Sequence, residues 1–244
     1  MNSKRNAEIL CLVKGLLKLG ITNYKANLIE LMAKSGVLMF GNFTTKSGRQ
    51  SPYFINSGYY KTGEQAEMVS IYYAAFINEK LKNKFNVLFG PAYKGIPLCT
   101  LTATALSRLY GINVGYCFNR KEMKDHGDGG IFVGWQPKDG DTFLITEDVI
   151  SAGTSVREVY PLLKAAANVS VTDMVISVDR MEKGYNGLTA IEEMQKEFGI
   201  TVHPLVTVLE IIEYLHNREI DGKIYINNEM KKNMISYVDQ YCVK

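Results

Sequence analysis

The segment from Phe143 to Val159, FLITEDVISAGTSVREV, constrains the fold of this chain more than any other. It opens with a short apolar run, Phe143–Thr146, which predicts a buried strand. Two adjacent acids, Glu147 and Asp148, and a loop of small residues follow. Apolar residues then recur at the spacing of one helix face: Val156, Val159, Tyr160 and Leu163. The segment therefore predicts a strand–loop–helix unit, although Pro161 should remove one hydrogen bond from the helix.

The loop Ser151–Ser155 predicts an anion site at the start of that helix. The first four helical N–H groups lack partners inside the helix, and the positive end of the dipole points outward. Glu147 and Asp148 stand just upstream, where carboxylates can accept hydrogen bonds from vicinal hydroxyls. Acids beside a phosphate loop indicate a ribose 5-phosphate. The competing interpretation, an ordinary turn with solvent-exposed acids, stays open at this point.

Size and composition limit the other classes of function. With 244 residues, 46% hydrophobic and 22% charged, the chain fits one α/β domain with its own core. A net charge of +3 gives no support for a nucleic-acid partner. No apolar run reaches the ~18 residues of a membrane span, and Lys14 and Lys18 interrupt any signal-like stretch. The four cysteines lack metal spacing, which favours reduced thiols in the cytoplasm.

Strands alternate with helices along the chain, which predicts a mostly parallel sheet flanked by helices. The expected strands are 87–89, 114–118, 131–135, 143–146, 172–178 and 202–207. The expected helices are 7–18, 25–35, 64–82, one ending near 109, one after Ser155, 209–216 and 228–241. We expect a polar, glycine-rich loop at 119–130. Ligands of such sheets bind beyond the carboxyl ends of the strands, so the polar loops there should form one site.

Four further segments carry polar residues beside predicted strands: FTTKSGRQSPYFIN (43–56), FGPAYKGIPL (89–98), NRKEMKDHGDGG (119–130) and SVDRMEKG (177–184). Each has an ordinary local interpretation. The first is a polar turn before an aromatic strand, and the second is a tight turn with an exposed lysine. The third is a solvated hairpin tip whose charges cancel, and the fourth is a surface ion pair between Asp179 and Arg180.

Together with the 143–159 segment, these stretches resemble, in the same order, the motifs of the orotate phosphoribosyltransferases, a branch of the type I phosphoribosyltransferases. The resemblance covers about Phe43 to Gly184. The chain departs from the family pattern in three places. Glu147 and Asp148 replace the commoner Asp-Asp, Ser151 replaces Thr, and Ile55 replaces a second Phe. The first two changes keep two carboxylates and a hydroxyl, whereas the third makes one surface of the base pocket aliphatic.

The resemblance implies the type I phosphoribosyltransferase fold, with a core at about 61–215. A small hood would come from about 1–60 and parts of the C-terminal region, and a β-hairpin loop would be flexible. It implies transfer of a 5-phosphoribosyl group from phosphoribosyl pyrophosphate (PRPP) to orotate, in pyrimidine (UMP) synthesis. It also implies a non-proline cis peptide in the pyrophosphate loop.

The resemblance further assigns site residues. Catalytic roles fall to Lys94, Lys124, His126 and Asp148. Orotate would contact Lys46, Phe54, Ile55, Ser151 and Arg180. PRPP would contact Lys46, Tyr93, Lys94, Arg120, Lys121, Lys124, His126, Glu147, Asp148, Val149, Ile150, Ser151, Ala152, Gly153, Thr154 and Ser155.

The implied cofactor is Mg²⁺, held mainly by PRPP with Glu147 and Asp148 as candidate protein ligands. The implied assembly is a homodimer in which the 119–130 loop acts on the neighbouring subunit. A second enzyme domain does not fit in 244 residues, so association with a separate orotidine monophosphate decarboxylase is one option. Two other functions stay open: a phosphoribosyltransferase for another nucleobase, against which Lys46, Phe54 and Arg180 argue, and a PRPP-sensing, nucleic-acid-binding regulator.

Overall fold

A computed structural model describes residues 22–45, 48–124, 130–150, 153–184 and 187–243. The helix predicted at 7–18 lies outside them. Within the described residues, the central sheet has six strands in the order β5-β4-β3-β6-β7-β8. Their bounds are β3 Val87–Gly90, β4 Gly115–Lys124, β5 Gly130–Gly134, β6 Thr142–Val149, β7 Ser170–Asp179 and β8 Thr201–Thr207. All neighbouring strands are parallel except β4 and β5. The predicted mostly parallel sheet is therefore confirmed.

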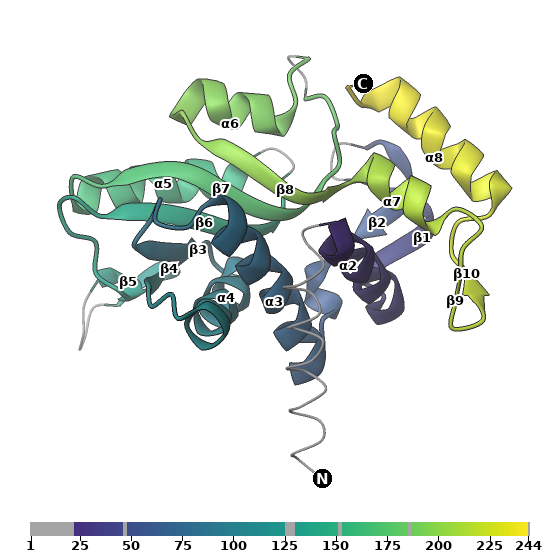
Figure 1. Ribbon diagram of the computed structural model, residues 1–244. Helices are drawn as coiled ribbons and strands as arrows, with labels where there is room; N and C mark the ends of the chain where they lie inside the picture. Colours follow the sequence, from purple (N-terminus) through teal and green to yellow (C-terminus); the bar gives the residue numbers. More distant parts are fainter. Residues whose placement is uncertain (1–21, 46–47, 125–129, 151–152, 185–186, 244) are drawn as a thin grey trace, which may run out of the picture.

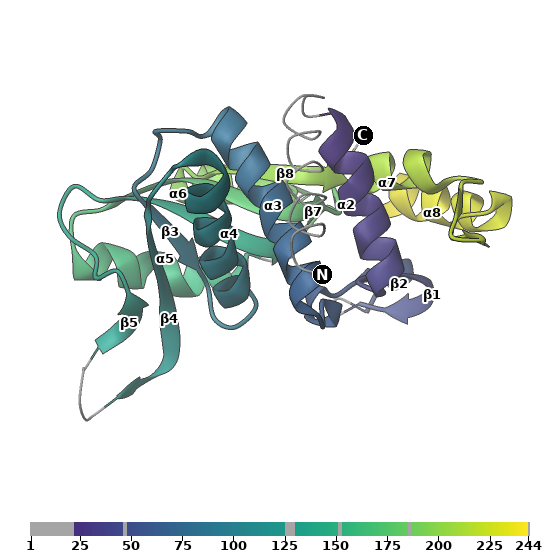
Figure 2. The same ribbon diagram turned by 60° about the horizontal axis from the view of Figure 1, so that its bottom comes forward.

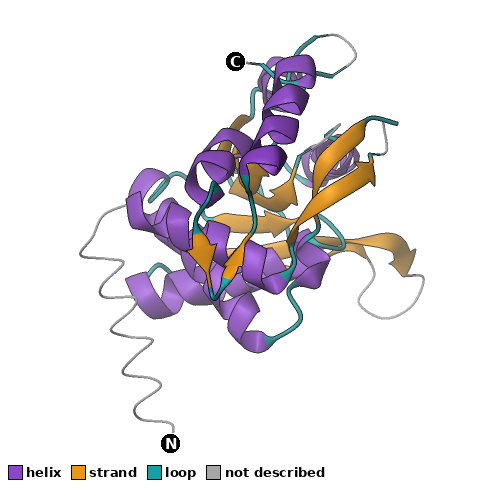
Figure 3. Cartoon of the chain, turned by 90° about the vertical axis from the view of Figure 1, so that its right-hand side faces the viewer, coloured by secondary structure: helices purple, strands orange, loops and turns teal. Residues whose placement is uncertain are grey.

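Helices cover both faces of this sheet (Figure 1; Figure 3). The four helices are α3 Gly63–Lys80, α4 Gly95–Tyr110, α5 Thr154–Ala166 and α6 Ala190–Phe198. Successive strand side chains alternate between the faces. Leu88 and Leu144 thus join the core under α3 and α4, whereas Phe89 and Phe143 join the core under α5 and α6. Burial on both faces explains why the strand sequences are apolar runs instead of alternating patterns.

The helix bounds follow local signals in the sequence. Thr62 and Gln65 form a reciprocal capping box at the start of α3. Gly111, in the left-handed conformation with φ of 66°, ends α4. Helix α5 contains Pro161, as expected from its sequence. Helix α6 was not predicted, although Thr189 and Glu192 form the same type of capping box at its start.

The remaining elements form a second group beside the sheet. They are α2 Thr22–Ser35, β1 Leu38–Thr44, β2 Gln50–Ile55, the 3₁₀ turn η1 Ser57–Tyr59, α7 Val208–Leu215, β9 Glu219–Ile220, β10 Lys223–Ile224 and α8 Asn228–Tyr241. Strands β1 and β2 pair antiparallel. Helix α2 reaches the sheet through the Tyr24 hydroxyl, which donates to the Leu205 carbonyl at 3.3 Å. Tyr237 of α8 packs edge-on against the Tyr53 ring of β2.

The segment 119–130 corrects one prediction. We expected a polar loop there, but β4 continues to Lys124 and pairs with β5 (Figure 2). The ladder is made by backbone groups, so polar side chains do not end it. The register shifts between Asn119 and Lys124 along the paired arms. The cations predicted for a loop thus stand mostly on a projecting strand.

No helix among the described residues combines the length and the apolar character needed to cross a membrane.

Candidate active site

Glu147 and Asp148, the two acids of the 143–159 segment, lie at the carboxyl end of β6 and are buried. Only 7% of Glu147 and 5% of Asp148 is exposed, so the interpretation as solvent-exposed acids is wrong. One carboxylate oxygen of Asp148, Oδ2, accepts a hydrogen bond from Ser57 Oγ at 2.6 Å. The same oxygen lies 3.3 Å from Lys94 Nζ. Three segments that are far apart in the sequence therefore meet at one carboxylate.

Burial and the neighbouring Asp148 carboxylate raise the pKa of Glu147 to about 8. Two buried polar side chains, those of Tyr73 and Ser177, lie next to the acid pair. The hydroxyl of the fully buried Tyr73 donates to the Glu147 carbonyl at 2.7 Å and lies 2.8 Å from Ser177 Oγ. These contacts satisfy the buried polar groups and fix the end of β6.

The loop between β3 and α4 brings Lys94 to Asp148. Gly90 and Gly95 are in such close contact that a Cβ on Gly90 would lie 2.1 Å from the Gly95 carbonyl oxygen. The Ala92–Tyr93 peptide is cis, which confirms the implied non-proline cis bond. The Ala92 N–H donates to Asn119 Oδ1 at 3.0 Å, which ties this loop to β4. Tyr93 itself is 72% exposed.

The predicted phosphate loop is described from Gly153 onward, so Ser151 and Ala152 lie outside the described residues. Gly153 precedes α5 with φ of 64°. It has no side chain that could cap the first helical N–H groups, which suits an anion site. Thr154 is exposed and Ser155 half-buried at the start of α5, beside the acid pair. Ile150 is buried in the core, so only its backbone can reach a ligand.

The predicted cations of the 119–130 segment lie on the projecting hairpin. Arg120 donates to the Gly130 carbonyl at 2.8 Å, across the two arms. Lys121 Nζ lies 2.5 Å from Glu158 Oε2 on α5. Lys124 is the last residue of β4. Its side chain and all of His126 lie outside the described part of the chain, as does Lys46.

The residues predicted to bind the base lie on or near β2. Phe54 stacks on Phe43 with ring centroids 5.5 Å apart. Ile55 is buried in the core, because neighbouring strand residues point to opposite faces. Of the two, Phe54 is therefore the side chain available for stacking. Arg180 pairs with Glu182 at 2.6 Å. The alternative local interpretation, a surface ion pair between Arg180 and Asp179, is therefore not the contact that the arginine makes.

Sequence reasoning missed several residues at this site, namely Ser57, Tyr73, Asn119 and Ser177. Ser57 lies 91 residues from Asp148 in the sequence, so no local pattern links them. The Asn56 side chain caps the η1 turn that presents Ser57, and this Asn-Ser pair was the one available signal. Among the described residues, no three His, Cys, Asp or Glu side chains form a metal-binding cluster.

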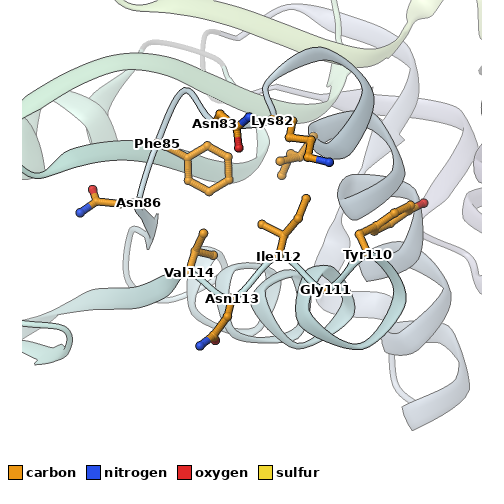
Figure 4. Close-up of a pocket in the computed structure, with 10 residues that line it drawn as sticks. Lys82, Asn83, Phe85, Asn86, Tyr110, Gly111, Ile112, Asn113 and Val114 are labelled. Carbon is orange, nitrogen blue, oxygen red and sulfur yellow. The ribbon is translucent and has the colours of Figure 1, made fainter.

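A cavity of about 400 Å³ lies elsewhere, at the amino ends of β3 and β4 (Figure 4). Phe85, Tyr110, Ile112 and Val114 line it together with asparagine side chains. It lies at the amino ends of the strands, whereas Asp148 and Lys94 lie at their carboxyl ends. Ligands of parallel sheets bind beyond the carboxyl ends, so this cavity is not part of the candidate active site.

Buried acids, a lysine and the start of α5 meet at the carboxyl ends of this mostly parallel sheet, and similarity to known proteins identifies the class of protein to which the chain belongs. The family profile described as "Phosphoribosyl transferase domain" matches residues 57–203. The chain belongs to the type I phosphoribosyltransferases, and within them to the orotate phosphoribosyltransferase family.

Two curated relatives and one solved structure show the similarity to orotate phosphoribosyltransferases. The chain is 48% identical to the orotate phosphoribosyltransferase of Clostridium botulinum, over 91% of this chain and 99% of that protein. It is 49% identical to that of Clostridium acetobutylicum over the same shares. The crystal structure of orotate phosphoribosyltransferase from Francisella tularensis is 36% identical, with a TM-score of 0.75 over 88% of this chain and 98% of that one.

Proposed function

We propose that the chain transfers the 5-phosphoribosyl group of PRPP to orotate, giving orotidine 5′-monophosphate and pyrophosphate in pyrimidine synthesis. One observation carries the proposal: Lys94 and Ser57 converge on the buried Asp148 beside the amino end of α5. This arrangement places an ammonium group 3.3 Å from a buried carboxylate, and a bound sugar phosphate could contact both groups. The family relationship favours orotate over another base and over a PRPP-sensing regulator.

The reaction separates charge, and the site residues match that separation. Breaking the bond from ribose C1 to pyrophosphate leaves a ribosyl cation and a polyanion. Asp148 and Glu147 would hold the ribose hydroxyls, while the loop before α5 would anchor the 5′-phosphate. Lys94 now pairs with Asp148, and in the complex it would turn to the pyrophosphate. A donor aimed at developing charge contributes about 3 kcal/mol to transition-state stabilisation.

The cations of the hairpin would complete the site. Arg120, Lys121 and Lys124 would bind the pyrophosphate, and His126 or a lysine would donate a proton to it. Closure of the hairpin would exclude water from the ribosyl cation. We also propose that the chain forms a homodimer in which each hairpin acts on the partner's site.

The acid pair also fits Mg²⁺. This ion uses one or two protein carboxylates and takes most of its remaining ligands from substrate phosphates and water. Asp148 and Glu147 supply two adjacent carboxylates, and the described residues offer no larger acidic cluster. When bound, the ion would neutralise the charge of the pyrophosphate. Because the pKa of Glu147 is raised to about 8, this carboxyl must lose its proton before it can act as a ligand.

The base would bind over β2. Phe54 would stack on the flat ring of orotate, and the cations Lys46 and Arg180 would bind its anionic groups. Ser151 would contribute from the phosphate loop. We propose a cytoplasmic location, a hood of about 1–60 with part of the C-terminal region, and a core of about 61–215. Association with a separate orotidine monophosphate decarboxylase would place the next reaction beside this one.

The test is the ultraviolet absorbance of orotate in the presence of purified protein, PRPP and Mg²⁺, with uracil, hypoxanthine and adenine as rival bases. Loss of the orotate signal that requires both PRPP and metal supports the proposal. Asp148→Asn should abolish the signal change, whereas Asp221→Asn, a surface acid paired with Lys34, should not. Turnover of another base would overturn the base assignment. PRPP binding without any turnover would favour the regulator.

A further inference from the structure

A second polar cluster joins Arg180 to the C-terminal helix α8, and it centres on Glu182. A single carboxylate oxygen, Glu182 Oε1, accepts hydrogen bonds from Arg180 Nε at 2.8 Å and from the Tyr237 hydroxyl at 2.8 Å. The same oxygen lies 2.6 Å from Arg180 Nη2. Glu182 therefore connects the predicted base-binding arginine to α8.

The other side of the Arg180 guanidinium is held by β2. Its Cζ lies 4.6 Å from the centroid of the Tyr53 ring, and its Nη2 donates to Ser51 Oγ at 3.4 Å. Tyr53 is fully buried and meets Tyr237 edge-on, with ring centroids 5.9 Å apart. The arginine is thus fixed between an aromatic face and a carboxylate, and its planar fork has a defined orientation. The hydrogen bonds to Glu182 and Ser51 use Nε and Nη2, and neither of them uses Nη1.

Backbone bonds attach the end of α8 to the same segment. The Lys183 N–H donates to the Tyr241 carbonyl at 2.8 Å, and the Val243 N–H donates to the Met181 carbonyl at 3.0 Å. Figure 1 shows α8 lying beside β2 at this end of the molecule. The tail after Lys223, to which no motif assigns a role, is therefore bonded directly to the segment that carries Arg180.

The charges of the cluster suit an anionic ligand. Arg49 Nη1 lies 3.7 Å from Glu182 Oε2, so Glu182 stands between two arginines. Of the three charged side chains joined by these contacts, two are cations and one is an anion. Glu182 could either orient Arg180 or compete with a ligand for it. Because Glu182 takes only one edge of the guanidinium, the geometry favours orientation.

We propose that Glu182 and Tyr237 are positioning residues for the base site: they hold the Arg180 guanidinium at the angle from which Nη1 binds the anionic base. The C-terminal helix thereby completes the orotate pocket. This inference rests on the proposed function, in which Arg180 contacts orotate.

The test is steady-state kinetics of four variants, with KM measured separately for orotate and PRPP. Glu182→Gln keeps the shape of the side chain and removes its charge, and should raise KM for orotate about tenfold, since hydrogen bonds to charged groups are the stronger ones. Tyr237→Phe deletes one hydroxyl and should raise it about threefold. KM for PRPP should not change in either variant. Tyr214→Phe is the matched control, because it removes a tyrosine bond to Glu30 at 2.7 Å away from this cluster. Arg180→Ala is the reference for loss of the contact.

The outcomes separate the proposed function of the chain from the positioning role of Glu182 and Tyr237. If the unaltered protein does not consume orotate, the proposed function fails and the inference fails with it. If orotate is consumed but Arg180→Ala leaves its KM unchanged, only the inference is overturned. An unchanged or lowered KM for orotate in Glu182→Gln and Tyr237→Phe also overturns it, the lowered value indicating competition. If Glu182→Gln does not fold, Tyr237→Phe against Tyr214→Phe decides alone.

Discussion

The end of β6 supplies the acids of the candidate site and the β4–β5 hairpin supplies several of its cations, and the two regions are built in opposite ways. At the end of β6, Glu147 and Asp148 are buried, and Ser57 and Lys94 hold Asp148 from two other segments. On the hairpin, Arg120 makes its described bond within the hairpin itself, and Lys121 pairs with Glu158 on the surface. The acids are preorganised within one chain, whereas in the proposed mechanism Arg120 and Lys121 would leave these partners to bind the substrate.

This difference follows from the cost of burial. A buried carboxylate needs fixed partners, so its geometry is set before any ligand arrives. Cations that bind a polyanion only during reaction can remain on the surface, where water solvates them. The contrast predicts that substitutions at the end of β6 and on the β4–β5 hairpin affect different steps of the reaction. In the proposed dimer, a substitution on the hairpin would affect the site of the partner subunit.

The largest expected effect comes from removing a hairpin cation. Lys124→Ala should lower turnover about a hundredfold or more, because it removes a donor from the developing pyrophosphate charge. The melting temperature should change little, since the hairpin projects from the core. Lys80→Ala, on the surface end of α3, is the control. Near-normal turnover of Lys124→Ala, measured by orotate absorbance, would remove this lysine from the mechanism.

Mixed dimers test whether the two regions act across subunits. Lys124→Ala and Asp148→Ala chains, each strongly impaired alone, should together recover about a quarter of the original rate, because half of a random mixture is mixed dimer with one intact site. Differently tagged chains and sequential affinity purification verify the mixture. No recovery in verified mixed dimers would show that hairpin and acids of the same chain work together.

The pKa of Glu147 predicts a pH effect on PRPP binding. Glu147 is largely protonated below its pKa of about 8. In the proposed mechanism, the carboxylate form is the one that would bind Mg²⁺ and PRPP. KM for PRPP should therefore fall as pH rises from 6 to 8, by up to about tenfold per unit, the limit for one proton. Glu147→Gln should flatten this dependence, and a slope that persists in it would assign the effect to another group.

The raised pKa of Glu147 also makes the stability of the fold depend on pH. Rising pH should strengthen PRPP binding but should lower the free energy of unfolding. The folded protein keeps this proton to a higher pH than the unfolded chain, in which the pKa of Glu147 is near its ordinary value of 4.5. The contribution of Glu147 to the free energy of unfolding is thus full below 4.5 and declines as pH rises to about 8. Urea titrations across this window should show a smaller decline in Glu147→Gln than in the unaltered protein.

The smallest expected effect concerns the Lys121–Glu158 pair. Glu158→Gln releases Lys121, and because an exposed pair contributes at most about 1 kcal/mol, KM for PRPP should fall no more than about fivefold. Glu67→Gln breaks another exposed pair, with Arg108, and should leave KM unchanged. A rise in KM would mean that Glu158 helps the hairpin to reach the substrate.

Local sequence patterns predicted most elements because burial and capping act over a few residues. The last helix was expected at 228–241 and observed there as α8 Asn228–Tyr241. Helix α6 was missed although its capping box at Thr189 and Glu192 and its final Gly199 are visible in the sequence. The 119–130 segment was misjudged because strand pairing depends on a partner strand, and side-chain polarity does not reveal the partner.

The candidate site shows the same difference between local patterns and contacts that join distant segments. The candidate residues could be named from the order of residue types along the chain: an acid pair, a small-residue loop before a helix, and cations in a glycine-rich segment. The folded structure was needed to show that Asp148 is buried, that Ser57 and Lys94 bind it, and that Glu182 links Arg180 to α8. The difference lies in the range of the interactions. Strand and helix propensities are local, whereas hydrogen bonds between residues about 50 to 180 positions apart exist only after the sheet has assembled and brought its strand ends together.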